Sequence, residues 1–543
     1  MHRFKPVTFG VLSAFVIALS ACGGSSNDAA DNSSDNSGAD NPPAATSGGE
    51  ITVLEEAAFA GSWPAGLDPA TNTNGAANQP YMDTIYGQLF KLVEGGEVVG
   101  ELAESGTLSS DGKTFTVKLR PGVKFTDGSP LDAATVKWNF DRSLASPCTC
   151  NPKSSWPKLE DPAVTTSGDD TVEIHFTAPF AAVSRSFISS NLNWMASKTT
   201  FDKVGEKAFK QKPVGAGPFT VVSNSPSNQL VLQKNPGYFR QGRPYLDKIT
   251  FKTIGGDQAA YQAMQAGQAD AYEGISTPAL VDQASKQPNL TTTQMLSTSP
   301  YVIQLNTTAP PFDDQKARDA VYYATDAEAI RKGLFNNRYP NSQTFTGPGG
   351  LFYKPTVPGY KTFDLEKAKQ LVSEMGGLQV TLGTINVLVA KQTTEALQSQ
   401  WAKAGIKTKI ESYDLAGLIK AFGGKWQAML QTAGAWDPAI GVGVGFRFNS
   451  HSPFTGVKDP KLDKLLAQAA GALQDSERQK LYDEAGKLIS DQSYAPFMFA
   501  FAPANIARKG VYGPGLTTKL PAVVVNVPVD WTEVYATKGG GTQ

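Results

Sequence analysis

Residues 111–130 read DGKTFTVKLRPGVKFTDGSP, and this stretch carries the strongest local signal of the fold. Phe115–Leu119 alternates apolar and polar residues, which is typical of a strand with one buried face. Asp111-Gly112, Arg120–Gly122 and Thr126–Gly128 have the composition of tight turns, because proline fixes φ and glycine accepts positive φ. The stretch therefore predicts strands joined by hairpin turns.

Strand and helix patterns alternate along the chain from Ile51 onward. Further strands are predicted at Val172–Phe176, Leu230–Gln233 and Ile249–Thr253. Helices are predicted over Ala133–Leu144, Gln258–Ala266, Asp314–Phe335, Leu365–Met375, Thr393–Lys403, Pro460–Leu473 and Ser476–Ile489. Between Leu378 and Tyr413 a strand, a helix and a second strand follow one another. This β-α-β order predicts a parallel sheet with helices packed on it.

The first 22 residues, MHRFKPVTFGVLSAFVIALSAC, indicate export. Arg3 and Lys5 precede an apolar core, Val7–Ala18, which is shorter than the roughly 20 residues that span a bilayer. This is the pattern of a secretory signal peptide, here 1–21. Leu19–Cys22 matches a bacterial lipobox, so Cys22 is predicted to be the lipidated N-terminus. An ordinary signal peptide with an incidental cysteine is the alternative.

A flexible tether is predicted at 22–50. Residues 23–49 contain only Gly, Ser, Asn, Asp, Ala, Pro and Thr, which cannot bury enough apolar surface to offset the entropy of ordering. As a coil the segment would extend about 30 Å. Because no later stretch is apolar for 18 residues, acyl chains on Cys22 would be the membrane anchor. The expected location is the extracytoplasmic face of the cell membrane, on the periplasmic or cell-wall side.

Composition excludes some classes of partner. The chain has 543 residues and a formal net charge of −1, and no cluster of Lys and Arg indicates nucleic-acid binding. Cys148 and Cys150 are predicted to form a local disulfide, since thiols outside the cytosol oxidise. Free thiols and a metal site are the alternatives. A bridge across one residue is strained, and no second cysteine pair or histidine cluster accompanies a metal site. No metal or cofactor is expected.

Motifs of catalysis are absent from the sequence. There is no HExxH and no GxSxG. Residues 106–114, GTLSSDGKT, place five residues between the glycines where a phosphate-binding loop needs four, and Gly441–Gly445 lacks the GxGxxG spacing. His175 lies in an alternating strand pattern, which indicates a structural role. The prediction is a binding protein, with an enzyme as the alternative because two distant carboxylates leave no sequence signature.

Several blocks together resemble one family, over roughly residues 51–535. They are Asp111–Pro130, Pro213–Phe219 (PVGAGPF), Asn235–Tyr238 (NPGY), Gln262–Asp270 (QAMQAGQAD) and Asn306–Asn336. These blocks resemble the extracytoplasmic solute-binding proteins of dipeptide, oligopeptide and nickel ABC importers, the family 5 bacterial solute-binding proteins. These blocks mainly form structure, such as the turns at Arg120–Gly122 and Thr126–Gly128 and the rigid elbow at Pro213–Pro218, so they indicate architecture and not ligand contacts.

The resemblance implies an α/β, two-lobed periplasmic-binding-protein-like fold, in the large cluster C form of type II. Lobe I would comprise 51–304 plus 500–543, with an extra subdomain at about 90–210, and lobe II would comprise 305–499. A hinge around Leu305 and Phe499 would allow rigid-body closure on a ligand. Contacts to both lobes would stabilise the closed form, which membrane permease subunits would recognise. A monomer is expected.

The resemblance also implies ligand residues. In QTAGAWDP, residues 431–438, Asp437 takes the place of an acid that pairs with a peptide α-ammonium, beside Trp436. Arg447 is a candidate for a ligand carboxylate, and Tyr86 lies on a helix that in the family borders the cleft. The structural alternatives are a turn residue for Asp437, core residues for Trp436 and Tyr86, and an internal ion pair for Arg447.

A di- or oligopeptide is the predicted ligand. This sequence has Ala439 where the family often has a second acid, and an unusual glycine-valine run follows. A metal chelate, haem or an oligosaccharide is therefore the alternative. So is a non-transport envelope lipoprotein that uses the same fold as an interaction module.

Overall fold

The computed structural model describes residues 42–56, 66–71, 75–146, 152–188, 190–432, 434–441, 443–452, 456–522 and 529–537. Residues 44–543 form one compact unit, to which the following description refers. Cys22, Cys148 and Cys150 lie outside the described residues, so lipidation and the disulfide stay predictions. Among the helices that the structure describes, none is long and apolar enough to span a bilayer.

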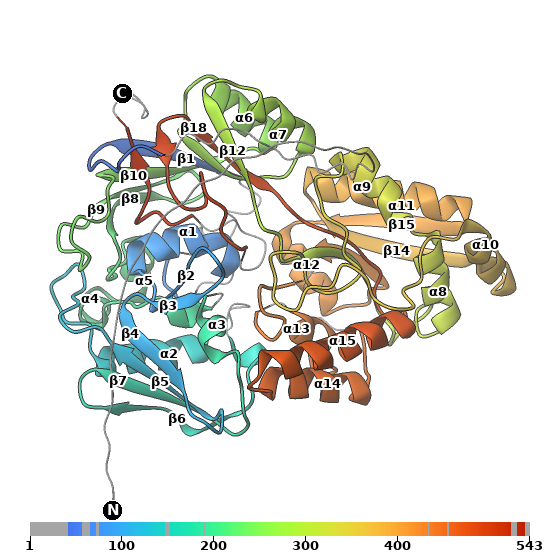
Figure 1. The fold of residues 1–543 in the computed structure, drawn as a ribbon, viewed down its shortest axis with the longest axis horizontal. Coiled ribbons are helices and arrows are strands. Elements are labelled where there is room, and N and C mark those ends of the chain that lie inside the picture. The colour runs from blue at the N-terminus through green and yellow to red at the C-terminus, as the bar shows by residue number, and fades with distance from the viewer. Residues whose placement is uncertain are drawn as a thin grey trace, which may run out of the picture. The chain divides into compact units, whose positions relative to one another are not determined.

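Seven of the described strands form the first sheet, in the order β12-β18-β11-β1-β10-β9-β8 (Figure 1). Their bounds are β1 Glu50–Glu56, β8 Phe219–Ser225, β9 Gln229–Lys234, β10 Lys248–Ile254, β11 Ala271–Ile275, β12 Leu290–Gln294 and β18 Ala504–Arg508. The strand β1 is parallel to β10 and to β11. Three helices belong to this part of the chain: α1 Gly75–Tyr86, α6 Asp257–Gln265 and α7 Pro278–Ser285.

Five described strands form the second sheet, in the order β15-β14-β16-β13-β17. Their bounds are β13 Pro300–Leu305, β14 Leu378–Ile385, β15 Ile406–Tyr413, β16 Ala428–Thr432 and β17 Phe497–Ala500. The helices here are α8 Gln315–Ala324, α9 Ala327–Phe335, α10 Leu365–Glu374, α11 Leu388–Lys403, α12 Leu415–Phe422, α13 Val444–Phe448, α14 Pro460–Gly471 and α15 Asp475–Asp491. Since β14 and β15 are parallel and α11 connects them, the predicted β-α-β unit is confirmed.

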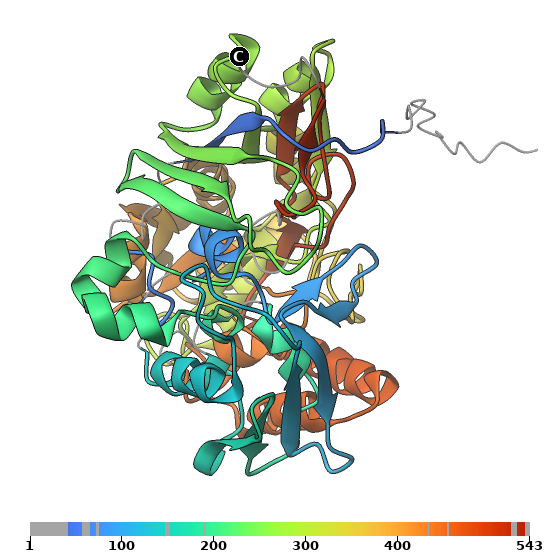
Figure 2. The same cartoon turned by 90° about the vertical axis from the view of Figure 1, so that its left-hand side faces the viewer.

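Thr114–Leu119 of the stretch quoted first belongs to a four-stranded antiparallel sheet, ordered β4-β5-β7-β6, which lies below the first sheet in Figure 2. The bounds are β4 Ala103–Leu108, β5 Thr114–Leu119, β6 Leu159–Ser167 and β7 Thr171–Phe176. Every second residue of β5 is buried, as the alternation predicts. Gly112 and Gly128 have φ of 71° and 85°, which their turns require.

Short helices and a hairpin surround this small sheet. They are α2 Ala133–Leu144, α3 Val183–Phe187, α4 Lys198–Val204, α5 Glu206–Gln211 and the hairpin of β2 Phe90–Leu92 with β3 Val98–Gly100. Two 3-10 turns, Pro152–Ser154 and Asn191–Asn193, and the strand pair β19 Val511–Tyr512 with β20 Tyr535–Ala536 complete the described elements. Asp132 caps α2 by accepting from the Thr135 N–H at 2.8 Å, which fixes the helix start that the sequence predicted.

The chain passes between the two large sheets twice within the described residues. It crosses at 295–299, between β12 and β13, and returns at 501–503, between β17 and β18. The predicted two-lobed α/β fold is thereby confirmed. The strand β13 begins at Pro300, so the second sheet starts a few residues before the expected boundary at 304 and 305.

One predicted helix is two helices. The expected helix Asp314–Phe335 is divided into α8 and α9. Thr325 is extended, its hydroxyl accepts from the Trp401 indole N–H at 3.0 Å, and Asp326 caps the second helix through the Ala329 N–H. Tertiary contact and a new N-cap thus interrupt a continuous helical pattern.

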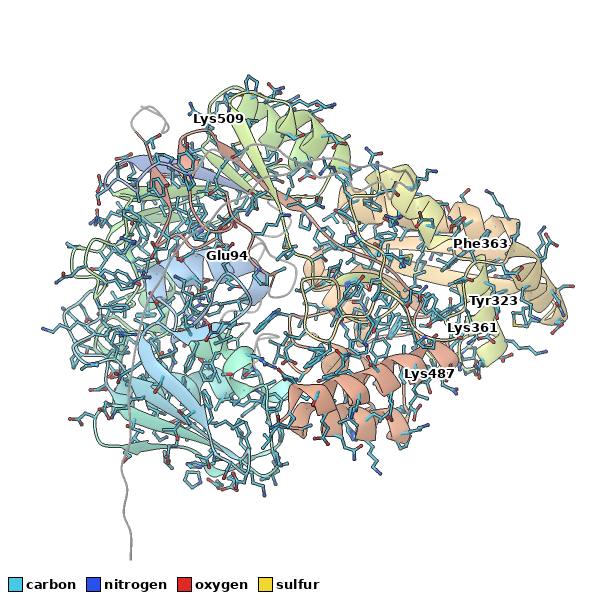
Figure 3. The ribbon with its side chains drawn as sticks, in the orientation of Figure 1. Glu94, Tyr323, Lys361, Phe363, Lys487 and Lys509 are labelled. Carbon is cyan, nitrogen blue, oxygen red and sulfur yellow. The ribbon has the colours of Figure 1, made fainter. Side chains whose placement is uncertain are left out.

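The loop before α10 is fastened to neighbouring helices. The Asp364 N–H donates to the Tyr323 carbonyl oxygen at 2.9 Å. Lys361 Nζ donates to Ser493 Oγ at 2.8 Å (Figure 3 labels Tyr323 and Lys361). These bonds hold the long connection between α9 and α10 against the second sheet's helices.

Candidate ligand-binding site

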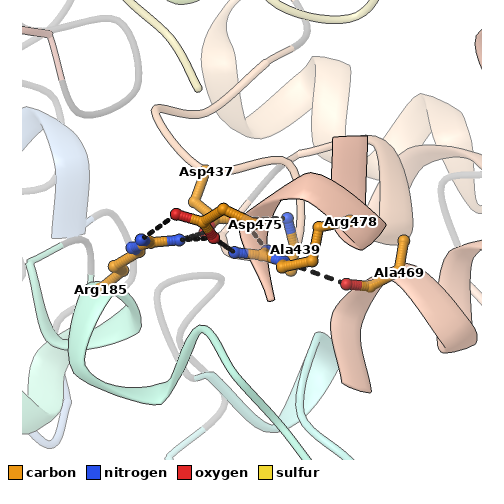
Figure 4. A network of polar contacts seen from close by, with 6 residues as sticks. All are labelled: Arg185, Asp437, Ala439, Ala469, Asp475 and Arg478. Carbon is orange, nitrogen blue, oxygen red and sulfur yellow. Dashed lines mark hydrogen bonds and ion pairs between the residues drawn. The ribbon is translucent and has the colours of Figure 1, made fainter. Parts of the chain in front are cut away.

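Asp437 lies in the loop after β16, and its carboxylate is already matched by the protein (Figure 4). Arg478 Nη2 donates to Oδ1 at 2.6 Å and Nη1 to Oδ2 at 2.9 Å. Arg185 Nη1 donates to Oδ2 at 3.1 Å, and the Ala439 N–H to Oδ1 at 2.9 Å. The side chain is 0% exposed. The predicted pairing of Asp437 with a ligand ammonium gains no support from this arrangement.

Electrostatics agree with an internal ion pair. Burial by itself would raise the pKa of Asp437, but the guanidinium groups of Arg478 and Arg185 hold it below its ordinary value. A buried carboxylate stays ionised when charged hydrogen bonds replace its water. Asp437 is therefore an anion whose charge is compensated within the chain.

Arg185, on α3, joins the four-stranded sheet and the short helices around it, called the small subdomain below, to the part of the chain that contains the second sheet, called the second lobe below. Besides Asp437 it pairs with Asp475, from Nη2 to Oδ2 at 3.1 Å. Close by, the Ala181 N–H donates to the Ala470 carbonyl oxygen at 3.0 Å. The two lobes therefore touch here through an ion pair and a backbone bond.

Trp436 strengthens the same contact. Its side chain is 2% exposed and packs among the buried apolar residues of the small subdomain, including Phe180 and Val183. The Arg185 guanidinium carbon is 5.9 Å from the ring centroid. Trp436 thus contributes to the contact between lobes, and its predicted role at a ligand stays a prediction.

Arg447, on α13, is a cation without an acid beside it. Its Nη1 donates to Gln431 Oε1 and its Nη2 to the Thr432 carbonyl oxygen at 3.5 Å. Its shielded Nε has no partner, and none of the described acids forms an ion pair with it. Burial lowers its pKa to about 10, so it is charged at neutral pH. A ligand carboxylate is a partner that this arrangement lacks.

Tyr86 is a core residue in this structure. It is the last residue of α1, 0% exposed, and its hydroxyl donates to the Leu67 carbonyl oxygen at 2.6 Å. Burial raises the pKa of its phenol above the ordinary value. Its contacts are those of a core residue, which was the alternative to a ligand contact. The predicted contact with a ligand stays a prediction.

The sequence analysis missed a group of acids at the first sheet. Glu55 is in β1 and Glu273 in β11, and the parallel register places the two side by side, since Val53 pairs with Ala271 and the strands advance together. Burial raises the pKa of Glu55 well above its ordinary value, and burial together with Asp83 raises that of Glu273 to about 8. Strand-end acids so far apart in sequence give no local pattern.

A pocket is lined by Asp83 and Trp531, two residues that interact with Glu273, although neither Glu55 nor Glu273 lines it. Its lining includes Gln79 and Asp83 of α1, together with Lys91, Asp530 and Trp531. Lys91 pairs with Asp530, and the Trp194 indole N–H donates to Asp83 Oδ1 at 2.7 Å. No group of three described His, Cys, Asp or Glu side chains is arranged to hold a metal ion.

Comparison with known proteins gives the class. Residues 97–453 match the model for bacterial extracellular solute-binding proteins, family 5 middle. The glutathione-binding protein GsiB of Salmonella paratyphi A is 30% identical over 450 residues, covering 79% of this chain and 85% of the relative. GsiB of Escherichia coli K12 is 29% identical over 447 residues, with the same coverage.

Solved structures match the fold. The periplasmic binding protein DppA of Helicobacter pylori, in complex with peptide STSA, aligns with a TM-score of 0.76 at 23% identity, covering 91% of this chain and 99% of that one. AgaA of A. tumefacien R10, in complex with agropinic acid, aligns with a TM-score of 0.75 at 21% identity, covering 90% and 99%.

The paired sheets with two crossings and the matching structures define a two-lobed binding protein. The chain belongs to family 5 of the bacterial extracellular solute-binding proteins. The family is one of extracytoplasmic binding proteins and not of enzymes, and the resemblance found in the sequence is confirmed.

Proposed function

We propose that this protein is the lipid-anchored substrate-binding component of an ABC importer, which captures a peptide or peptide-like molecule between its lobes. The observation that carries the proposal is the family match across both lobes, with GsiB relatives named for glutathione binding. DppA of H. pylori in complex with a tetrapeptide adds support through its similar fold. Delivery to membrane permease subunits follows from membership of the family.

The proposed motion is a hinge closure of lobe I, 51–304 plus 500–543, on lobe II, 305–499. The segments 295–299 and 501–503, which cross between the sheets, are the places for the bending. Two adjacent crossings restrict relative motion to a hinge. The Arg185 contacts with Asp437 and Asp475 would then be among those that closure makes.

Arg447 is the proposed anchor for a ligand carboxylate. It offers a half-buried, charged guanidinium without a described acidic partner, and guanidinium groups bind carboxylates with paired hydrogen bonds. Trp436 and Asp437 would act beside it by holding the second lobe against the small subdomain.

A non-peptide solute is the second candidate ligand. AgaA, which shares the fold, is in complex with agropinic acid, so this architecture accommodates other small organic acids.

The proposed membrane anchor is Cys22. Acyl chains on this residue would hold the protein at the membrane, and residues 23–49 would act as the tether.

Native mass spectrometry of protein purified without denaturation tests the function. We expect a co-purified ligand whose mass and fragments identify a peptide or an amino-acid conjugate. Calorimetry with an equimolar tripeptide library, after the ligand has been stripped, should then give saturable binding. A chain that carries no ligand and binds neither peptides nor amino-acid conjugates would contradict the proposal.

A further inference from the structure

Two glutamates of the first lobe lie side by side at the ends of parallel strands. Glu55 and Glu273 belong to β1 and β11, whose register pairs Leu54 with Tyr272 immediately before them. Glu55 is the last residue but one of β1, and Glu273 is the third of the five residues of β11. In open α/β sheets, ligands bind at the carboxyl ends of parallel strands. The two acids are therefore where a ligand group would approach the first lobe.

Neither glutamate is neutralised by the described part of the chain. Tyr81 donates its hydroxyl to Glu55 Oε2, but Oε1 of Glu55 and Oε1 of Glu273 are shielded from solvent and have no hydrogen-bond partner there. Glu55 is only 7% exposed, and no described Lys or Arg forms an ion pair with either acid. Burying an ionised carboxylate without a partner costs free energy, so the two glutamates lack a cationic partner when they are ionised.

Lys91, the lysine that lines the pocket, already forms an ion pair. Lys91 pairs with Asp530, and the Trp194 indole N–H donates to Asp83.

The raised pKa values of Glu55 and Glu273 agree with two carboxyl groups that have no cation beside them. Burial comes first among the causes for both acids; the neighbouring Glu273 raises the pKa of Glu55 further, and Asp83 that of Glu273. The Trp531 indole acts in the opposite direction on Glu273 and lowers its pKa, but not enough to offset burial. Each carboxylate disfavours ionisation of the next, which a bound cation would reverse. The competing explanation is a purely structural pair that shares a proton and never meets a ligand.

We propose that Glu55 and Glu273 together form the acceptor for a cationic group of the ligand, a primary ammonium or a guanidinium. The inference rests on the proposed function and moves the expected cation partner from Asp437, which Arg478 and Arg185 neutralise, to the first lobe. An ammonium donates three hydrogen bonds and accepts none, so two adjacent carboxylates with free oxygens suit it. The charge of the ligand offsets the repulsion between the two acids.

The test uses ligand-stripped protein and two kinds of probe. The first is a tripeptide library in free-amine and N-acetylated forms, and the second is 1,4-diaminobutane, an ammonium compound without a peptide bond. Glu55→Gln and Glu273→Gln are compared with wild type and with Glu104→Gln, which changes an exposed acid of β4. Glutamine preserves size, and thermal unfolding checks that each variant folds.

The expected result is a difference that depends on the ligand's charge. Charge-assisted hydrogen bonds are worth about 1.5–3 kcal/mol, so each Gln variant should bind free-amine tripeptides about 10- to 100-fold more weakly than wild type. The N-acetylated library should bind wild type and both variants equally, and Glu104→Gln should bind like wild type throughout.

The other outcomes separate this inference from the proposed function. Equal binding of free-amine tripeptides by wild type and folded Gln variants would overturn the cation site while leaving a peptide ligand in place. Binding of the diamine by wild type but not by the variants, with no binding of any tripeptide, would support the cation site and overturn the peptide assignment. If neither probe binds wild type, both proposals fail.

Discussion

Arg478 and Asp437 form a fully buried ion pair with two hydrogen bonds, at 2.6 and 2.9 Å, and both side chains are 0% exposed. Arg478 also donates from Nε to the Ala469 carbonyl oxygen at 3.0 Å. The pair therefore fixes the loop after β16 to the start of α15 and to α14. This geometry gives the ion pair a structural role.

Replacing Asp437 with Asn should destabilise the fold. Removing one partner of a buried ion pair leaves an uncompensated charge and costs about 3–5 kcal/mol, which urea denaturation would measure. Asp475→Asn is the matched control: its carboxylate also meets Arg185, but its side chain is 58% exposed, so we expect less than about 1 kcal/mol. An Asp437→Asn variant as stable as wild type, but unable to bind free-amine peptides, would restore the ligand role predicted from the sequence.

Arg185→Gln should weaken the contact between the small subdomain and the second lobe without unfolding either. Arg185 pairs with both Asp437 and Asp475, as Arg478 also does, and its side chain is 24% exposed, so the loss in stability should be about 1 kcal/mol. Small-angle scattering should give a larger radius of gyration for the variant than for wild type. The control is Arg331→Gln, which breaks a pair within α9. Identical scattering curves for the variant and wild type would show that this contact does not hold the lobes together.

Arg447→Met should weaken recognition of a ligand carboxylate. The expected loss is about 10- to 100-fold in affinity for tripeptides with a free C-terminus, measured by calorimetry. C-terminally amidated tripeptides should bind the variant and wild type equally. The loss in stability should come from the lost packing and from the hydrogen bonds to Gln431 and Thr432, because the guanidinium has no described counter-ion. If both peptide forms lose affinity alike, Arg447 only supports Gln431 and the second sheet.

Cys22→Ala should release the protein from membranes. The lipobox Leu19–Cys22 and the polar segment 23–49 make acylation the one anchor that the sequence predicts. Fractionation of cells that express wild type or the variant, followed by immunoblotting, measures the change. Equal retention of both in the membrane fraction would mean that another feature holds the protein there.

Local sequence patterns predicted the elements well and their interruptions poorly. Ala133–Leu144 is a helix with the predicted bounds because Asp132 supplies a local cap. The pattern over Asp314–Phe335 did not reveal its break at Thr325, because that break depends on a hydrogen bond from Trp401, a residue distant in sequence. Helix periodicity reports the buried face, whereas a distant side chain decides where the helix stops.

The site was harder to predict for the same reason. The sequence placed Asp437 in an informative loop but gave no sign that Arg478 and Arg185, 41 and 252 residues away, would neutralise it. Glu55 and Glu273 become neighbours only through the parallel register of two strands. Charge pairing between distant segments depends on the folded structure, so it cannot be predicted from a single sequence.

The stability of the ligand-free protein should fall as the pH rises through neutrality, and Glu273 should account for part of that fall. Burial and Asp83 raise the pKa of Glu273 from 4.5 to about 8. Between these values the unfolded chain has released the proton while the folded chain still holds it, so each increase in pH favours unfolding. Below 4.5 both states are protonated, and above about 8 both are ionised, so the contribution of Glu273 is then constant. Glu273→Gln removes this dependence.

The free energies of unfolding of wild type and Glu273→Gln should therefore diverge between pH 5 and pH 8.5. One pKa unit corresponds to about 1.4 kcal/mol, and we expect the variant to gain at least that much relative to wild type over this interval. Urea denaturation at both pH values measures the difference, with Glu104→Gln as the exposed control. Parallel pH profiles for wild type and Glu273→Gln would mean that Glu273 ionises normally in the folded protein, with a cation or water beside it.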